Sequence, residues 1–245
     1  VHEELDAYRA SGQRVPEQYE STVAHYDEAV EHARKAISVV GNLGMDAMSI
    51  CLQKDSLAGG AYMWHDPISR AQPHKFLELP ITGDIYWSLN LTRARLGSQM
   101  EGGQNLAGAE SERRIPLGCN NETCSAIIDT GTSLIVAPTH VVIAVKEAIS
   151  KWSLEGGTCR DLSALPDLNF ELNNHHFSLP PEAYVGKIHG SLGNHIRSFM
   201  PHVASDEGKR HEQAGCELLL MTMDVESQFG MLWILGMPFF RKYYT

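Results

Sequence analysis

The sequence predicts a mostly β fold with a few helices, in which a long N-terminal helix precedes a β-rich region. Two hydrophobic patterns lead to this prediction. Apolar side chains recur every three or four positions from residue 16 to residue 40, and from Met48 onward they alternate with polar ones in short segments. The 245 residues, 43% of them hydrophobic, supply enough apolar material for a substantial core.

The N-terminal helix is predicted over residues 16–40. Its apolar stripe consists of Val23, Tyr26, Val30, Ala33, Ile37 and Val40. Pro16 suits the first turn of a helix, and Gly41 is predicted to end it. The opposite, charged face is expected to be exposed to solvent.

The β-rich region is predicted to contain a series of short strands. They are expected at residues 48–53, 61–64, 76–80, 85–91, 126–128, 134–136, 165–179, 218–223 and 233–236, with a turn at Asn173-Asn174 dividing 165–179 into two. A second helix is predicted from Pro138 onward, with Val141, Val145 and Trp152 on its buried face. Residues 97–117 and 186–215, rich in glycine and polar side chains, are predicted to form long exposed loops.

The composition excludes several classes of partner. Twenty Lys and Arg residues against thirty Asp and Glu give a net charge of −10, which would repel a nucleic-acid backbone. No apolar run is long enough for a membrane-spanning helix. The histidines lack the spacing of metal ligands, and adjacent His175 and His176 in a strand would point to opposite faces. Neither a metal nor a cofactor is expected.

The five cysteines include no C-x-x-C pair, which argues against a zinc site. Cys119 and Cys124 bracket four residues and can close a small disulfide loop, and Cys159 and Cys216 could close a larger one. Cys51 is left over in an alternating run and is expected to be a buried thiol.

Two N-glycosylation acceptor patterns are present, Asn90-Leu91-Thr92 and Asn121-Glu122-Thr123. In an alternating strand Asn90 and Thr92 would lie on the opposite face from Leu89 and Leu91. A glycan on Asn90 has to be on that outward face. Together with the candidate disulfides, these patterns favour the secretory pathway, either an acidic lumenal compartment of the lysosomal or vacuolar kind or secretion.

The tripeptide Asp129-Thr130-Gly131 is the candidate catalytic motif. It follows the apolar residues Ile127 and Ile128 and precedes another apolar segment, so its carboxylate would be held in a tight turn at the end of a strand. A catalytic acid or base needs such a rigid, partly desolvated position. The alternative is an aspartate that only accepts hydrogen bonds from its own turn.

Several further motifs occur in order around this tripeptide. They are Tyr86-Trp87, the pair Cys119 and Cys124, the octapeptide Ala-Ile-Ile-Asp-Thr-Gly-Thr-Ser at 126–133, Leu-Pro-Asp-Leu-Asn-Phe at 165–170, Leu-Pro-Pro-Glu-Ala-Tyr at 179–184, the pair Cys159 and Cys216, Trp-Ile-Leu-Gly at 233–236, Phe239, and Arg-Lys-Tyr-Tyr-Thr at 241–245. Together they resemble the C-terminal half of the pepsin-like aspartic proteases, from about Met45 to Thr245.

This resemblance implies a division of the chain into a helical segment at residues 1–44, a remnant of a first lobe or an interlobe region, and a pepsin-like C-terminal lobe at 45–245. It also implies disulfides Cys119–Cys124 and Cys159–Cys216. The expected activity is that of an aspartic-type endopeptidase, which hydrolyses peptide bonds with water activated between two aspartates that share one proton.

The resemblance assigns a role to each residue of the motif. Asp129 would be one of the two catalytic aspartates. The residues expected to support the active-site loop are Thr130, whose hydroxyl would bridge two lobes, Gly131, Thr132 and Ser133, with Ile234, Leu235 and Gly236 bracing the loop from below.

The chain also departs from the family pattern. It contains no second Asp-Thr-Gly or Asp-Ser-Gly, and Met237 stands where the family usually has aspartate. The favoured hypothesis is an endopeptidase whose second aspartate lies upstream of Val1, so the monomer alone is not expected to cleave peptides efficiently. The alternatives are a catalytically inactive peptide-binding relative or truncated fragment, and a homodimeric protease in which two copies of Asp129 meet.

Overall fold

The computed structural model describes residues 6, 10–12, 17–36, 39–45, 47–54, 58–83, 86–97, 115–120, 124–151, 162–188, 193–201 and 217–245. The chain divides into two compact units. The first comprises residues 1–48 with 64–66, and the second comprises 49–63 with 67–245. The division after residue 44 expected from the sequence stays a prediction.

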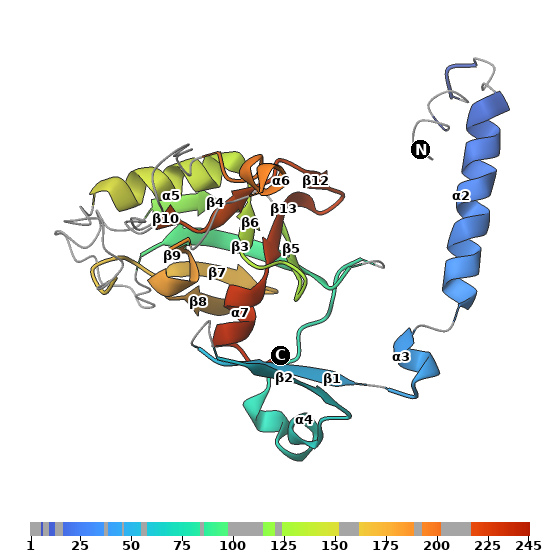
Figure 1. Ribbon diagram of the computed structural model, residues 1–245. Helices are drawn as coiled ribbons and strands as arrows, with labels where there is room; N and C mark the ends of the chain where they lie inside the picture. Colours follow the sequence, from blue (N-terminus) through green and yellow to red (C-terminus); the bar gives the residue numbers. More distant parts are fainter. Residues whose placement is uncertain are drawn as a thin grey trace. The chain divides into compact units, whose positions relative to one another are not determined.

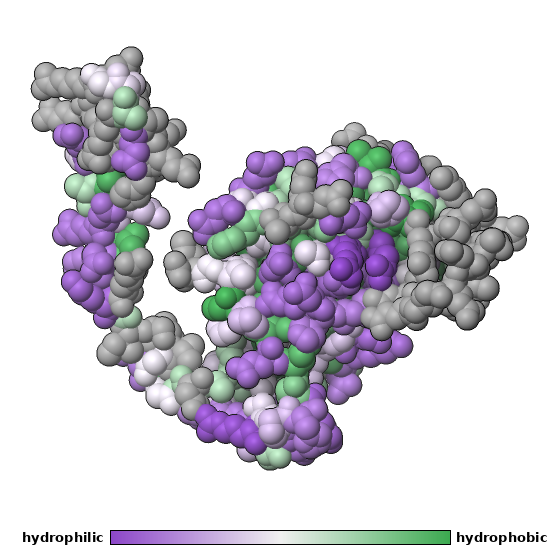
Figure 2. Space-filling view, turned by 180° about the vertical axis from the view of Figure 1, so that it is seen from behind, coloured by the Kyte–Doolittle hydropathy of each residue, from purple (hydrophilic) through white to green (hydrophobic). Residues whose placement is uncertain are grey.

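The first unit contains α2 (Glu17–Lys35) and the short α3 (Val39–Asn42). The prediction of one helix over 16–40 that ends at Gly41 is wrong, because α2 ends at Lys35 and Gly41 lies inside α3. Ile37, Val39 and Val40, which follow the end of α2 in the sequence, are β-branched, and β-branched residues have a lower helix propensity. Figure 2 shows hydrophilic side chains over most of α2, and Tyr26 on the apolar stripe is 51% exposed.

The second unit begins with a two-stranded sheet of β1 (Met48–Leu52) and β2 (Gly60–Trp64), whose outermost residues Met48 and Trp64 belong to the first unit. Ile50 in β1 exchanges two backbone hydrogen bonds with Thr245. After α4 (Pro67–Ala71) and η1 (Pro73–Lys75), the strand predicted at 76–80 is absent. Pro80 has no N–H to donate to a ladder, which accounts for this difference.

A nine-stranded mixed sheet dominates the second unit (Figure 1). Its strands run in the order β11-β6-β13-β5-β3-β7-β8, with β12 on β13 and β4 on β3. They are β3 (Ser88–Leu96), β4 (Ile115–Gly118), β5 (Cys124–Ile128), β6 (Ile135–Ala137), β7 (Leu168–Leu172), β8 (His175–Leu179), β11 (Leu220–Thr222), β12 (Glu226–Ser227) and β13 (Gly230–Leu235). The remaining elements are α5 (Thr139–Lys151), η3 (Pro181–Ala183), β9 (Val185–Gly186), α6 (Asn194–Arg197), β10 (Glu217–Leu218) and α7 (Met237–Lys242).

The core of this unit is built on the sheet, with α5 packed against β4 and β11 and α7 packed against β8. Figure 1 shows α5 beside β4. Val141 and Val145 of α5 are at most 1% exposed, as the predicted helical stripe requires. In β3, Leu89 and Leu91 are buried and Asn90 is half-buried, so the predicted alternation is confirmed. Trp152 lies outside the described residues.

The two predicted loops contain regular structure. β4 occupies the end of the stretch at 97–117, because residues 115–118 pair with β3. The short helix α6 lies within the stretch at 186–215. The sequence pattern missed both elements because four residues are too few to establish a period.

The small disulfide between Cys119 and Cys124 is present, with a distance of 5.6 Å between the two Cα atoms. Cys159, Cys216 and Asn121 lie outside the described residues, so the larger disulfide stays a prediction. Cys51 is a free thiol, half-buried where the sequence predicted a buried one, because the β1–β2 sheet covers it only in part.

Candidate active site

Asp129 lies in a loop that crosses the end of another strand. β5 and β6 follow each other in the sequence, but β13 lies between them in the sheet, parallel to β5 and antiparallel to β6. Residues 129–134 connect β5 to β6 and therefore pass over the end of β13. The backbone N–H of Asp129 donates to the carbonyl oxygen of Leu235, the last residue of β13, over 3.1 Å.

Both carboxylate oxygens of Asp129 accept hydrogen bonds from the loop itself. The backbone N–H of Gly131 donates to Oδ1 over 2.8 Å, and the hydroxyl of Thr132 donates to Oδ2 over 2.6 Å. A carboxylate held at both oxygens has little freedom to rotate. The side chain remains half-buried, and within the described part of the chain it forms no ion pair.

Gly236 allows this loop to pack closely against the end of β13. A Cβ atom at this position would lie 2.2 Å from the carbonyl oxygens of both Thr132 and Leu134, so the loop can approach only because the side chain is absent. The next residue, Met237, donates its backbone N–H to the oxygen of Thr132 over 2.8 Å. The structure thus brings Leu235 and Gly236 under the loop of Asp129, and Ile234 pairs with Ile127 of β5 and Val136 of β6.

The other motif residues are less constrained. Thr130 is half-buried and Ser133 is exposed, and neither hydroxyl has a hydrogen-bond partner among the described residues. Next to the loop, the carbonyl oxygen of Trp87 accepts from Ile128 N–H over 2.9 Å. Trp87 and Tyr86 are 67% and 62% exposed, so two large aromatic side chains face solvent beside β5, the strand that precedes Asp129.

Another carboxylate anchors α5, the helix that follows the Asp129 loop and β6. Asp224 accepts the backbone N–H and the hydroxyl of Thr139, over 2.8 and 2.7 Å, at the first turn of α5. Hydrogen bonds from the Thr139 hydroxyl and then from its backbone N–H hold the pKa of Asp224 below its usual range; burial opposes them, and the charge of His140 adds a smaller lowering effect. Sequence reasoning missed this contact because 85 positions separate the two residues.

The described residues offer no metal site, since no group of three or more His, Cys, Asp or Glu side chains there could hold an ion. In the same part of the chain, no helix has the length and apolar character needed to cross a bilayer.

A lobe built of a mixed sheet, with an Asp-Thr-Gly loop resting on a Leu-Gly segment, defines a pepsin-like protein. The sequence model described as "Eukaryotic aspartyl protease" matches residues 22–245. The chain belongs to this family, and the β-rich unit is a lobe of the pepsin-like fold preceded in the sequence by a long helix.

Known relatives agree with this assignment. The chain is 26% identical to pepsin A of Gallus gallus over 203 residues, which are 83% of this chain and 44% of that protein. It is 28% identical to gastricsin of Mus musculus over 172 residues, 68% of this chain and 34% of that protein. Pepsin II-2/3 of Oryctolagus cuniculus is 26% identical over 209 residues, 84% of this chain and 43% of the relative. The chain therefore spans less than half the length of these relatives.

Proposed function

We propose that this chain supplies one half of the active site of an aspartic-type endopeptidase, with Asp129 as one of two catalytic aspartates. The observation that carries the proposal is the double hydrogen bonding of the Asp129 carboxylate by Gly131 and Thr132, in a loop supported by Gly236. A structural aspartate needs neither the half-exposed position nor the supporting glycine. Membership of the aspartyl protease family supports the same reading.

The chemistry requires a second carboxyl group close to Asp129. Two carboxyl groups in contact share one proton, because both cannot be ionised at that distance. The ionised one takes a proton from water as the water attacks the scissile carbonyl carbon, and the protonated one donates to the carbonyl oxygen. Within the described residues, no hydrogen bond links Asp129 to another carboxyl group.

The second aspartate is proposed to come from a first lobe encoded upstream of Val1. The length of the relatives supports this source, because each is more than twice as long as the part that the chain matches. The half-buried hydroxyl of Thr130, which has no partner among the described residues, is proposed to bridge to the equivalent loop of that lobe. A second copy of this chain is the alternative source.

A peptide or protein is the proposed substrate. Tyr86 and Trp87 support it, because exposed aromatic side chains beside the catalytic loop offer apolar area to a peptide's side chains. The proposed location is an acidic lumenal compartment or the exterior of the cell, where disulfides such as Cys119–Cys124 persist.

The test compares three forms of the protein in a peptide-cleavage assay at acidic pH. The chain alone is expected to be inactive, and the product of an upstream-extended reading frame is expected to be active. Asp129→Asn in the extended protein should abolish cleavage, whereas Glu147→Gln, which changes an exposed carboxylate on α5, should leave it intact.

Two outcomes would replace the proposal with an alternative. Activity of the chain alone that rises with the square of its concentration and disappears in Asp129→Asn indicates the homodimeric protease. Binding of a peptide by the extended protein without cleavage, unchanged by Asp129→Asn, indicates the inactive peptide-binding relative.

A further inference from the structure

We propose that Asn90 carries an N-linked oligosaccharide, placed on the face of β3 opposite the buried side chains of Leu89 and Leu91. The acceptor pattern Asn90-Leu91-Thr92 alone is a weak signal. Its place in β3, the environment of the side-chain amide and the contacts of Thr92 supply the structural case.

The backbone of β3 directs Asn90 away from the core. Leu89 and Leu91 are 6% and 0% exposed and face the core, so the side chain between them faces the other side of the sheet. Its cross-strand neighbour in β5 is Ser125, a small residue, so no large side chain lies directly opposite in the ladder. Ser125 itself is only 1% exposed, whereas the half-buried Asn90 side chain reaches solvent on this face.

The side-chain amide of Asn90 is not used by the fold. The backbone N–H of Asn90 donates to Oδ1 of Asn173 over 3.0 Å, and its carbonyl oxygen accepts from Asn173 N–H over 2.8 Å. Among the described residues, the Asn90 amide itself has no hydrogen-bond partner, although the side chain is half-buried. Its Nδ2 is therefore available for a covalent bond that costs the fold no hydrogen bond.

Two nearby asparagines differ in this respect. Nδ2 of Asn169 in β7 donates to the carbonyl oxygens of Gly97 and Asp167, and Asn169 is 2% exposed. Nδ2 of Asn173 donates to the oxygen of Pro80 over 2.7 Å. Neither of these amides could carry a sugar without loss of a structural hydrogen bond.

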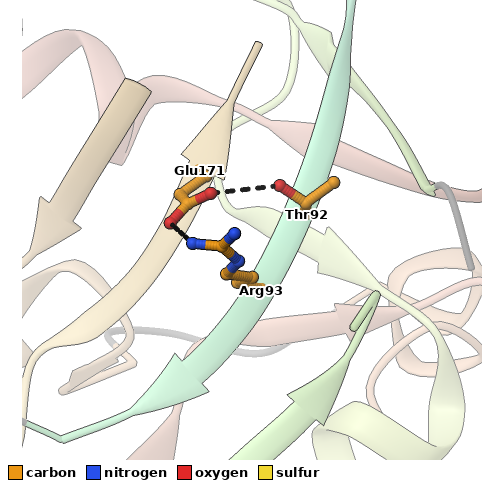
Figure 3. A network of polar contacts seen from close by, with 3 residues as sticks. All are labelled: Thr92, Arg93 and Glu171. Atoms are coloured by element: carbon orange, nitrogen blue, oxygen red, sulfur yellow. Dashed lines mark hydrogen bonds and ion pairs between the residues drawn. The ribbon is translucent and has the colours of Figure 1, made fainter. Parts of the chain in front are cut away.

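Thr92 connects the acceptor pattern to a polar network (Figure 3). Its hydroxyl donates to Oε2 of Glu171 over 3.4 Å, and Arg93 forms an ion pair with Oε1 of the same carboxylate over 2.8 Å. This network forms only when β3 and β7 pair. Before folding, the Thr92 hydroxyl is therefore free to be recognised by the enzyme that transfers the oligosaccharide to Asn90. A conservative change of Thr92 can keep the acceptor pattern, which gives the experiment a matched control.

The transfer step uses a lipid-diphosphate-linked oligosaccharide as the donor. A bond forms between Nδ2 of Asn90 and C1 of the first sugar, while the bond from C1 to the diphosphate oxygen breaks. Nδ2 loses one proton, and the lipid diphosphate is the leaving group. No oxidant or reductant takes part.

The test expresses the 245-residue chain behind a cleavable signal peptide in a eukaryotic secretory host. The purified protein is treated with peptide N-glycosidase in heavy-oxygen water, which converts each glycosylated asparagine to labelled aspartate. The peptide that contains Asn90 is expected to carry the label. Asn90→Gln should lower the mass of the untreated protein by one oligosaccharide.

Two substitutions at Thr92 separate the acceptor pattern from the fold. Thr92→Ser keeps both the pattern and the hydroxyl and is expected to retain the glycan. Thr92→Val removes the hydroxyl and is expected to lose it, whereas Glu171→Gln changes the polar network alone and should leave it in place. The proposal is overturned if the Asn90 peptide of the secreted protein carries no heavy-oxygen label. This holds whether or not Asn121 is glycosylated. Because the readout is mass, its failure would leave the proposed protease activity untouched.

Discussion

Thr132 donates its hydroxyl to Oδ2 of Asp129 over 2.6 Å, three residues along the same loop. The Gly131 N–H donates to Oδ1, so both carboxylate oxygens accept hydrogen bonds from donors in the same loop. The orientation of the carboxylate is therefore built into a short stretch of sequence, while the position of the stretch depends on β13 beneath it.

Replacing Thr132 with valine should destabilise the loop. Valine keeps the shape of threonine but cannot donate to the half-buried carboxylate, so we expect the free energy of unfolding to fall by about 1 kcal/mol. Urea denaturation monitored by tryptophan fluorescence measures this change. Thr132→Ser keeps the hydroxyl, so its free energy of unfolding should fall by less than that of Thr132→Val. Equal losses in the two variants would show that the hydrogen bond contributes nothing.

Replacing Gly236 with alanine should be far more disruptive. The new methyl group would lie 2.2 Å from two backbone oxygens, which cannot move without lifting the Asp129 loop from β13. We expect a loss of about 3 kcal/mol in unfolding free energy. The control is Gly59→Ala, because a Cβ at Gly59 meets nothing within 4 Å. That variant should change the same free energy by less than about 0.5 kcal/mol, and similar losses at both sites would contradict the steric argument.

Asp224 should stabilise the fold in a pH-dependent way. The Thr139 hydroxyl lowers the pKa of Asp224 below its ordinary value of 3.8, so its contribution is present above that value. The contribution is lost as the pH falls through the pKa of the folded state, because the carboxyl group then takes up a proton.

We expect Asp224→Ala to lose about 1 kcal/mol of stability at neutral pH, the usual cost of removing a helix cap. The difference from the unmodified protein should shrink in strong acid. Chemical denaturation between about pH 2 and pH 7 measures both effects. Glu226→Ala is the control, since the Glu226 side chain forms no hydrogen bond or ion pair in the described regions. A constant difference across this pH range would refute the prediction for Asp224.

Tyr243 should stabilise the outer strand β8. Its hydroxyl accepts from the N–H of Ser178 over 2.9 Å and donates to the carbonyl oxygen of Ser178 over 3.0 Å. Tyr243→Phe leaves both backbone groups without this partner, so we expect a loss of about 2 kcal/mol in unfolding free energy. Tyr62→Phe alters an exposed tyrosine and should have little effect.

The pH dependence at Tyr243 has the opposite sign to that at Asp224. Burial, and to a smaller extent the charge of Asp167, raises the pKa of Tyr243 above 10.0, while the Ser178 hydrogen bond opposes the rise. The contribution is present below 10.0 and is lost as the pH rises through the folded pKa. Alkaline denaturation of the unmodified protein and of Tyr243→Phe should converge, and a gap that widens with pH would count against this account.

Local patterns predicted much of the β-rich unit. The alternation of Leu89, Asn90 and Leu91 gave the correct buried face of β3, and the stripe of Val141 and Val145 gave that of α5. Prediction was wrong where local preferences compete, as at the end of α2, and where elements are very short, as with β4 and α6. β4 is a strand because it pairs with β3, a long-range contact that the local pattern does not contain.

The sequence by itself determined the family, the Asp129-Thr130-Gly131 motif and the hydrogen bonds between Asp129 and Thr132, because the motif and these hydrogen bonds depend on residues a few positions apart. Only the tertiary structure decided that Gly236 lies under the loop of Asp129, that Asp224 caps α5 at Thr139, and that Asn90 keeps its amide unbonded. These relationships depend on the insertion of β13 between β5 and β6 and on the pairing of β3 with β7. Periodicity specifies which face of a strand is buried, but it does not specify which strand lies beside it.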